Sequence, residues 1–258
     1  MIFMRSLMFW ICVILITIPV GILLSLFIPL HQSVRFFTVR LWWRAFMWLA
    51  RHIVGVKVLV KGRENIPDKP VLVLSKHESA WETVGLQSIF VPAVFVLKKE
   101  LLRIPFFGWG LFALRMIAIN RDAGRKALQQ MLEQGRNRLD SGIWVIVFPE
   151  GTRVPPGEHV PYKSGAAYLA LKTGTPVLPV AHNAVDVWPK KAFRIHAGLI
   201  TVSIGPLIAT HGLKDKEINT AVAGWIEAEM RRIAPHRYAS ATDEAGRENR
   251  GDDDAETH

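Results

Sequence analysis

Residues 70–83 read PVLVLSKHESAWET, and this stretch carries the local signals of a strand, a turn and a helix in direct succession. The run PVLVL predicts a buried strand over 70–74, because short continuous runs of aliphatic and β-branched residues are typical of strands in parallel sheets. A polar loop follows, and a helix is predicted near 80–90. The stretch therefore predicts one strand–loop–helix unit of an α/β fold.

The same alternation of strands and helices continues along most of the chain. Further strands are predicted near 54–60, 93–97, 115–119, 143–148, 176–180 and 196–204. Further helices are predicted near 123–140, 162–173 and 215–233. Such an order predicts the α/β fold class, with a largely parallel sheet flanked by helices.

The N-terminal segment is a candidate membrane anchor. Residues 7–30 include no charged side chain, and 24 residues are enough to span a bilayer as a helix. A secretory signal peptide is the alternative, since Arg5 precedes the run, but the run is long for a signal core and no small-x-small cleavage site follows it. Pro19 and Gly21 fall inside the run, so a kinked or re-entrant helix stays open as well as a full span.

Residues 33–53 predict a second helix, which combines arginines and tryptophans at helical spacing. These are Arg40, Arg44 and Arg51, and Trp42, Trp43 and Trp48. The combination is typical of a helix that lies in the lipid headgroup region. A helix packed on the protein body with an exposed basic edge is the alternative.

Charge and composition divide the chain into three parts. Hydrophobic residues make up 50% of the chain and the net charge is +10, but residues 239–258 hold seven acids and two arginines, so the other 238 residues carry +15. A basic body favours anionic lipid, phosphorylated substrates or acidic proteins. The single cysteine, Cys12, excludes a disulfide within the chain. We expect membrane-anchoring helices over 1–53, a catalytic domain over 54–237, and a disordered acidic tail over 238–258.

His77 and Glu82 form a candidate catalytic pair in the loop after the predicted strand. On one continuous helix these positions would differ by about 140° and would not share a face, so they meet only if the chain turns between them. A histidine held by a carboxylate is the usual arrangement of a general base, because the carboxylate stabilises the imidazolium that forms. The alternative is a loop histidine beside an unrelated glutamate at a helix N-terminus.

Further charged residues follow other predicted strands. VFPEGTR (147–153) places Glu150 and Arg153 where a strand ends, with Gly151 between them, and a surface turn with an ion pair is the alternative. Ligands of open α/β sheets bind at the carboxyl ends of strands. Arg121 follows another strand, and two arginines from separate strand ends suit a phosphate group.

Two further residues complete the candidate site. Lys163 precedes a predicted helix, whose N-terminus favours anions. Pro179 lies inside the strand predicted over 176–180.

Four blocks in this order resemble a known family. They are KHESAWE (76–82), MIAINR (116–121), FPEGTR (148–153) and VLPVA (177–181). The chain resembles the PlsC-type 1-acyl-sn-glycerol-3-phosphate acyltransferases over roughly residues 55–205. The third block is specific by itself, and the others are specific through their order and spacing.

The resemblance implies a role for each matching residue. His77 would be the general base and Glu82 its partner, although the family usually has aspartate at the position of Glu82. Arg121 would bind the glycerol phosphate, and Pro179 would shape the acyl-donor side. The phosphate would also be held by the third block, through Glu150, Gly151, Thr152 and Arg153.

The resemblance also implies the reaction and the partners. The enzyme would transfer an acyl group from acyl-CoA or acyl carrier protein to the sn-2 hydroxyl of lysophosphatidic acid, with no cofactor and no metal ion. It would lie at the cell inner membrane, on anionic lipid, with its catalytic domain on the cytoplasmic side.

Three other functions stay open from the sequence. A different lysolipid could be the acceptor, and the chain could be a membrane-binding homologue without activity. Nucleic-acid binding is the third, but it is disfavoured because the basic residues are dispersed and the aromatic residues concentrate near the N-terminus.

Overall fold

The fold is built on one twisted, mostly parallel sheet. We describe a computed structural model of residues 1–120, 123–190 and 193–238. These residues form a seven-stranded sheet of order β1-β7-β6-β2-β5-β3-β4. The strands are β1 (Val56–Lys61), β2 (Leu72–Ser75), β3 (Ala93–Lys98), β4 (Ile117–Ile119), β5 (Trp144–Val147), β6 (Val177–His182) and β7 (Gly198–Ile204). All neighbouring strands pair parallel except β6 and β7, which confirms the predicted fold class.

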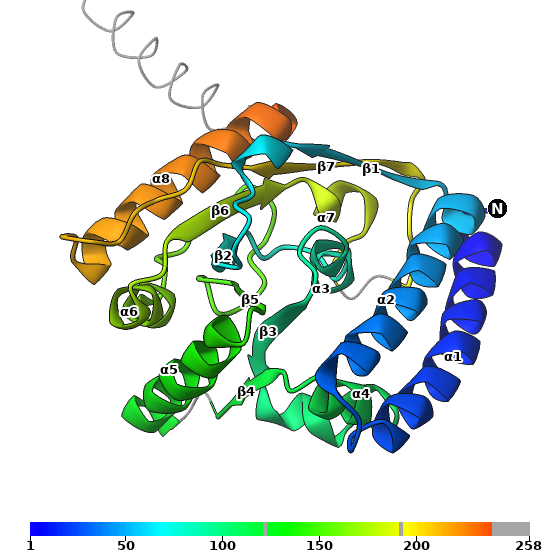
Figure 1. The fold of residues 1–258 in the computed structure, drawn as a ribbon. Helices are drawn as coiled ribbons and strands as arrows, with labels where there is room; N and C mark the ends of the chain where they lie inside the picture. The colour runs from blue at the N-terminus through cyan, green and yellow to red at the C-terminus, as the bar shows by residue number, and fades with distance from the viewer. Residues whose placement is uncertain (121–122, 191–192, 239–258) are drawn as a thin grey trace, which may run out of the picture.

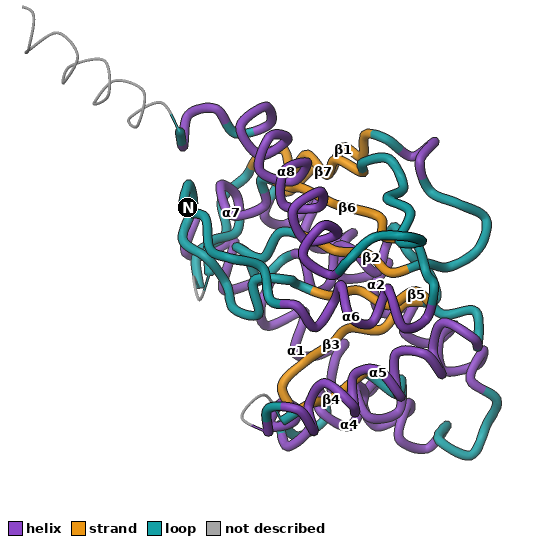
Figure 2. The backbone as a smooth tube through the Cα atoms, turned by 90° about the vertical axis from the view of Figure 1, so that its left-hand side faces the viewer, coloured by secondary structure: helices purple, strands orange, loops and turns teal. Residues whose placement is uncertain are grey.

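Helices cover both faces of this sheet (Figure 1). The α-helices are α1 (Ile2–Leu26), α2 (Gln32–Leu49), α3 (Glu82–Gly85), α4 (Phe107–Ala113), α5 (Arg125–Asp140), α6 (Ser164–Thr173), α7 (Ala184–Val187) and α8 (Asp215–Ile233). Shorter helical turns are η1 (Ala50–Val54), η2 (Arg63–Asn65), η3 (Leu86–Ser88), η4 (Lys99–Arg103) and η6 (Pro235–Arg237). Helices α5, α6 and α8 lie along one face, and α1 and α2 lie side by side on the other (Figures 1 and 2).

The predicted helix over 80–90 is shorter in the structure. Helix α3 covers four residues and continues as the 3₁₀ turn η3. Gly85 packs directly on the Trp81 ring, where a Cβ atom would lie 2.2 Å from a ring carbon. Because Trp81 is fully buried, the chain cannot shift to relieve such a contact, and the close packing requires glycine.

The central strands are buried on both faces. Leu72, Val73 and Leu74 of β2 and Val145 and Ile146 of β5 are all 0% exposed. Parallel strands covered by helices on both sides are expected to be apolar throughout, which is why their sequences do not alternate. The loops after β2 and β5 leave the same edge of the sheet, and this edge carries the polar residues of interest.

Helix α1 is the one helix, among the described residues, that is long and apolar enough to cross a membrane. It has 25 residues and a mean hydropathy of 2.8, and much of its apolar surface is exposed. Helix α2 and the turn η1 that extends it expose Arg40, Arg44 and Arg51 beside Trp48. This N-terminal region suits association with a membrane, as expected from the sequence.

Helix α1 meets α4 through a close backbone contact at Gly21. A Cβ atom built at Gly21 would lie 2.5 Å from the carbonyl oxygen of Phe106. Phe106 has a φ of 60°, so the backbone there is already in a conformation that few non-glycine residues adopt. The contact therefore sets a short distance between the backbones of α1 and the start of α4.

We expect Gly21→Ala to destabilise the protein by about 1–3 kcal/mol, because the added methyl group forces α1 away from α4. Thermal unfolding in detergent measures the change. Gly224→Ala is the matched control, since Gly224 lies in α8 with open space around it, and it should stabilise by about 0.5–1 kcal/mol. Equal effects of the two substitutions would contradict this account of Gly21.

Candidate active site

The loop that leaves β2 brings His77 and Glu82 together. His77 Nδ1 lies 2.5 Å from Glu82 Oε1, which confirms that the chain turns between them. The turn is set by Ser79, whose N–H donates to Glu82 Oε2 at 2.8 Å and whose hydroxyl donates to the Trp188 carbonyl at 2.6 Å. Glu82 therefore accepts hydrogen bonds at both carboxyl oxygens.

Burial controls the electrostatics of Glu82. The side chain is fully buried, and this burial raises the pKa of Glu82 well above its usual range, although the Ser79 N–H and the charge of Arg153 act in the opposite direction. A poorly solvated carboxylate gains more from a neighbouring positive charge than a solvated one. Glu82 is thus suited to stabilise an imidazolium at His77.

The His77 ring is held flat against an aromatic side chain. It stacks on Phe148 with ring centroids 4.0 Å apart, and Phe148 in turn stacks on Phe95. Since Nδ1 faces Glu82, proton exchange with a ligand in front of the ring must pass through Nε2. The carboxylate and the stacking together fix both the position and the tautomer of the His77 ring.

His77 opens onto a cavity of about 450 Å³ that is mostly apolar. Side chains of α1, α2, α4 and β3 form its walls, among them Val20, Leu24, Trp42 and Val96. At its polar end lie His77, Thr152, Arg153 and Lys190. The cavity can therefore hold a long apolar group whose polar end reaches the histidine.

The loop after β5, which contains FPEGTR, is tied to the His77 loop by hydrogen bonds. The Val154 N–H donates to the His77 carbonyl at 2.8 Å, and Arg153 Nε donates to the Ser79 carbonyl at 2.8 Å. Gly151 has a φ of 71°, so the turn that presents Arg153 favours glycine at this position. The Arg153 bond uses one of five guanidinium N–H groups, so the side chain can also bind an anion in the cavity.

Glu150 contacts the backbone of His77 and does not line the cavity. Its Oε1 accepts from the backbone N–H of His77 at 3.3 Å and lies 3.8 Å from Lys76 Nζ. Burial raises the pKa of Glu150 to about 7, against the opposing effects of Lys76 and the His77 N–H. Glu150 therefore supports the loop and carries a proton over part of the neutral range.

Known proteins share this sequence and fold. A match to the family described as Acyltransferase spans residues 57–183. The chain is 43% identical over 211 residues to the 1-acyl-sn-glycerol-3-phosphate acyltransferase of Pseudomonas aeruginosa, covering 81% of this chain and 82% of that one. This chain belongs to the PlsC-type glycerolipid acyltransferases.

Two further comparisons agree with this assignment. The human 1-acyl-sn-glycerol-3-phosphate acyltransferase alpha is 30% identical over 171 residues, which cover 65% of this chain and 60% of the human one. The crystal structure of the 1-acyl-sn-glycerophosphate (LPA) acyltransferase PlsC from Thermotoga maritima matches the fold with a TM-score of 0.75. That match has 24% identity and covers 89% of this chain and 94% of the other.

The structure of the acyltransferase places Lys163 and Pro179 apart from the cavity lining. Lys163 is exposed at the start of α6, and its aliphatic side chain lies where a Cβ atom of Gly151 would be. Pro179 is buried in β6 opposite Leu74 of β2, inside the sheet. Arg121 lies outside the described residues, as does the tail from 239 to 258.

Sequence reasoning missed Lys190 as a candidate site residue of this acyltransferase. Lys190 lies at the cavity and donates from Nζ to the Arg153 carbonyl at 3.0 Å. Its signal in the sequence was weak: a lysine after Trp188-Pro189, in a segment without periodicity. In the described part of the chain, no three His, Cys, Asp or Glu side chains converge in a way that could hold a metal ion.

We expect the free energy of unfolding of the acyltransferase to depend on pH through the protonation of Glu150. A carboxyl group whose pKa rises from 4.5 to about 7 on folding binds more protons in the folded state between these values. Its contribution to stability is therefore full below about pH 4.5 and is lost as the pH rises towards 7.

The variant Glu150→Gln should lack this loss, so native stability should fall relative to the variant by about 3 kcal/mol between pH 4.5 and 7. Chemical denaturation of both proteins across this range measures the difference. Parallel stability profiles would show that Glu150 does not change its protonation on folding.

Proposed function

We propose that His77 and Glu82 catalyse acyl transfer to the sn-2 hydroxyl of 1-acyl-sn-glycerol-3-phosphate, which gives phosphatidic acid. The observation that carries this assignment of roles is the 2.5 Å contact between His77 Nδ1 and Glu82 Oε1 at the polar end of an apolar cavity. The apolar space can hold the acyl chain of the lipid, and a general base beside it can take the proton of the lipid hydroxyl.

The proposed reaction uses one base and no covalent acyl-enzyme. His77 Nε2 takes the proton of the sn-2 hydroxyl as its oxygen attacks the thioester carbonyl, and Glu82 stabilises the imidazolium. The tetrahedral intermediate then collapses, the C–S bond breaks, and the imidazolium returns the proton to the leaving thiolate. The products are the ester of phosphatidic acid and a free thiol.

The phosphate of the acceptor meets cations at the polar end of the cavity. Arg153 supplies a guanidinium that is suited to bidentate contact with phosphate oxygens, and Lys190 adds a second positive charge nearby. Arg121 is proposed as a third cation from its place in the second sequence block. Lys163, Gly151 and Thr152 would contribute through the turn that carries Arg153.

The membrane position follows from the lipid nature of the substrates. The walls formed by α1 and α2 connect the cavity to the segment that associates with a membrane, so an acyl chain can enter without crossing water. We place the catalytic domain on the cytoplasmic side of the inner membrane, because thioester donors are made in the cytoplasm. A body charge of +15 favours both anionic lipid and an acidic acyl carrier protein as donor.

We expect His77→Ala to lower kcat by ~10² to 10⁴-fold, because the hydroxyl loses its general base. Glu82→Gln should lower kcat by ~10²-fold, since a neutral amide cannot stabilise the imidazolium, whereas Glu82→Asp should keep much of the activity. Acyl transfer from a radiolabelled acyl thioester to lysophosphatidic acid in detergent measures these rates. His211→Ala, a change at an exposed histidine, is the control, and a His77→Ala enzyme as fast as this control would refute the mechanism.

We expect Val20→Phe to shift donor or acceptor preference to shorter acyl chains, because the larger ring fills the apolar end of the cavity. The value of kcat/KM for the longest chains should fall ~10-fold, with less effect on short ones. Ile14→Phe introduces the same ring on the outer side of α1, where Ile14 is 55% exposed, and should leave chain preference unchanged. Equal profiles for the two variants would place the acyl chain elsewhere.

A further inference from the structure

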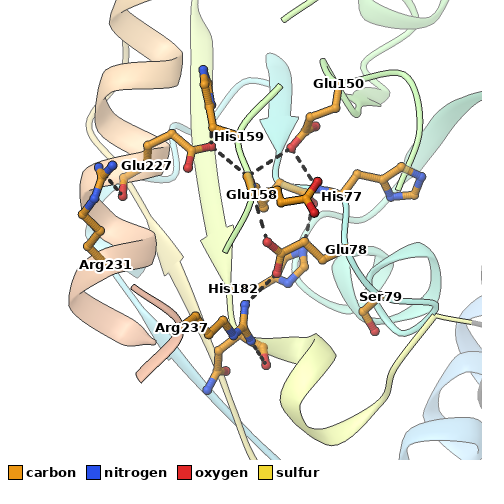
Figure 3. Close-up of polar contacts among 12 residues, drawn as sticks. His77, Glu78, Ser79, Glu150, Glu158, His159, His182, Glu227, Arg231 and Arg237 are labelled. Carbon is orange, nitrogen blue, oxygen red and sulfur yellow. Dashed lines mark hydrogen bonds and ion pairs between the residues drawn. The ribbon is translucent and has the colours of Figure 1, made fainter. Parts of the chain in front are cut away.

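The residues on either side of His77 are charged and completely buried. Lys76 and Glu78 are both 0% exposed, which is unusual for these residue types. These residues follow directly after β2, which ends at Ser75. Figure 3 shows Glu78 pointing into a cluster of charged groups and the His77 ring pointing away from it. The His77 side chain lines the cavity, while Lys76 contacts the charged cluster through Nζ.

Lys76 is anchored to the last long helix of the described chain. Its Nζ lies 2.8 Å from Glu227 Oε1 of α8, and 3.8 Å and 4.0 Å from the carboxylates of Glu150 and Glu78. Its backbone is held as well, because the Lys76 N–H donates to the Val180 carbonyl at 3.0 Å. The residue before the base is thus fixed at both its main chain and its side chain.

Glu78 is anchored to the turn that follows α8. Arg237 of η6 donates from Nη1 to Glu78 Oε2 at 2.7 Å. The same guanidinium lies 2.7 Å from Asp186 Oδ1 and donates to the Asn183 carbonyl at 3.3 Å. Although Arg237 is close to the end of the described chain, its side chain is 5% exposed.

His182 adds a neutral support beneath the same loop. Burial lowers the pKa of His182 to about 4, so the ring is uncharged near neutral pH. The Ala184 N–H donates to its Nδ1 at 3.4 Å, which assigns the proton to Nε2, and Nε2 donates to the Lys76 carbonyl at 2.9 Å. Nε2 also lies 3.4 Å from Glu82 Oε2, so the His182 ring contacts the carboxylate that is paired with His77 as well.

These contacts reach the base from a part of the chain that the four sequence blocks do not include. Glu227 and Arg237, which we name the C-terminal clamp, carry opposite charges and bind opposite charges at positions 76 and 78. A buried ion pair is strongly destabilising to break, because one charge is then left without a partner. Removal of either residue of the clamp would therefore leave a buried charge without that partner next to His77.

We propose that Arg237 is a positioning residue for the reaction, which holds His77 in its catalytic geometry through the ion pair with Glu78. This inference rests on the proposed role of His77 as the general base. A displacement of about 1 Å in a catalytic group can cost ~10²-fold in rate without a change in the chemistry. Loss of the Arg237 contact should therefore affect turnover more than acceptor binding, since Arg237 is outside the cavity lining.

The test compares Arg237→Ala with Arg237→Lys and with a matched control, Arg232→Ala. Arg232 is also an arginine near the end of α8, and it is ion-paired with Glu229, but its side chain is 57% exposed. We expect Arg237→Ala to lower kcat by about 10- to 100-fold with KM for lysophosphatidic acid within about twofold of native. Arg237→Lys should recover part of the rate, and Arg232→Ala should match the native enzyme.

Folding is measured on the same preparations, by thermal unfolding in detergent, and assays are run below each transition. Should Arg237→Ala fail to fold, Glu78→Gln addresses the same contact, because Arg237 keeps its ion pair with Asp186. A fall in kcat at unchanged KM in folded Arg237→Ala, with partial recovery in Arg237→Lys, supports the inference. If Arg237→Ala does not fold, the same fall in folded Glu78→Gln supports it. A native kcat, a loss confined to KM, no recovery in Arg237→Lys, or an equal loss in Arg232→Ala overturns it.

Inclusion of His77→Ala separates this inference from the proposed mechanism. If His77→Ala is as fast as native, the general base is misassigned and the positioning role falls with it. If His77→Ala is inactive and Arg237→Ala has native kcat, the mechanism stands and the positioning role alone is wrong.

Discussion

The parallel pairing of β2 with β5 is the constraint on which the active site depends. Leu72, Val73 and Leu74 pair with Val145, Ile146 and Val147, so the two strands end at the same edge of the sheet. The loop that carries His77 then leaves directly beside the turn that carries Arg153, and hydrogen bonds join the two loops. The apolar interiors of both strands give this pairing its stability, and the polar residues occupy only the ends, where water or a ligand can reach them.

The two sides of the His77 loop have opposite physical character. In front is a largely apolar cavity, whose lining includes the charged side chains Lys98, Arg153 and Lys190. Behind it is a dense cluster of buried charges, where burial raises the pKa of both Glu82 and Glu150. His77 lies between these two regions, and its side chain is 12% exposed.

Local sequence signals predicted the strands and long helices well, because hydrophobic periodicity and turn residues are short-range properties. The approach of His77 to Glu82 was also predictable, since five residues and one turn separate them. Helix α4 was missed because its sequence FGWGLFA contains two glycines and shows little helical preference. The contacts of Lys76 and Glu78 could not be predicted, since 151 and 159 residues separate them from Glu227 and Arg237. Such pairs depend on the packing of α8 against β6, which local patterns do not specify.

The position of Arg237 has a consequence for the order in which the enzyme matures. A ribosome makes α1 first and η6 last among the described elements, so the contact between Arg237 and Glu78 cannot form until synthesis has passed residue 237. Helix α1 is therefore complete well before that contact can form. The His77 loop therefore lacks this ion pair while the segment between α1 and η6 is being made, and the loop can be fixed only after residue 237 has been added.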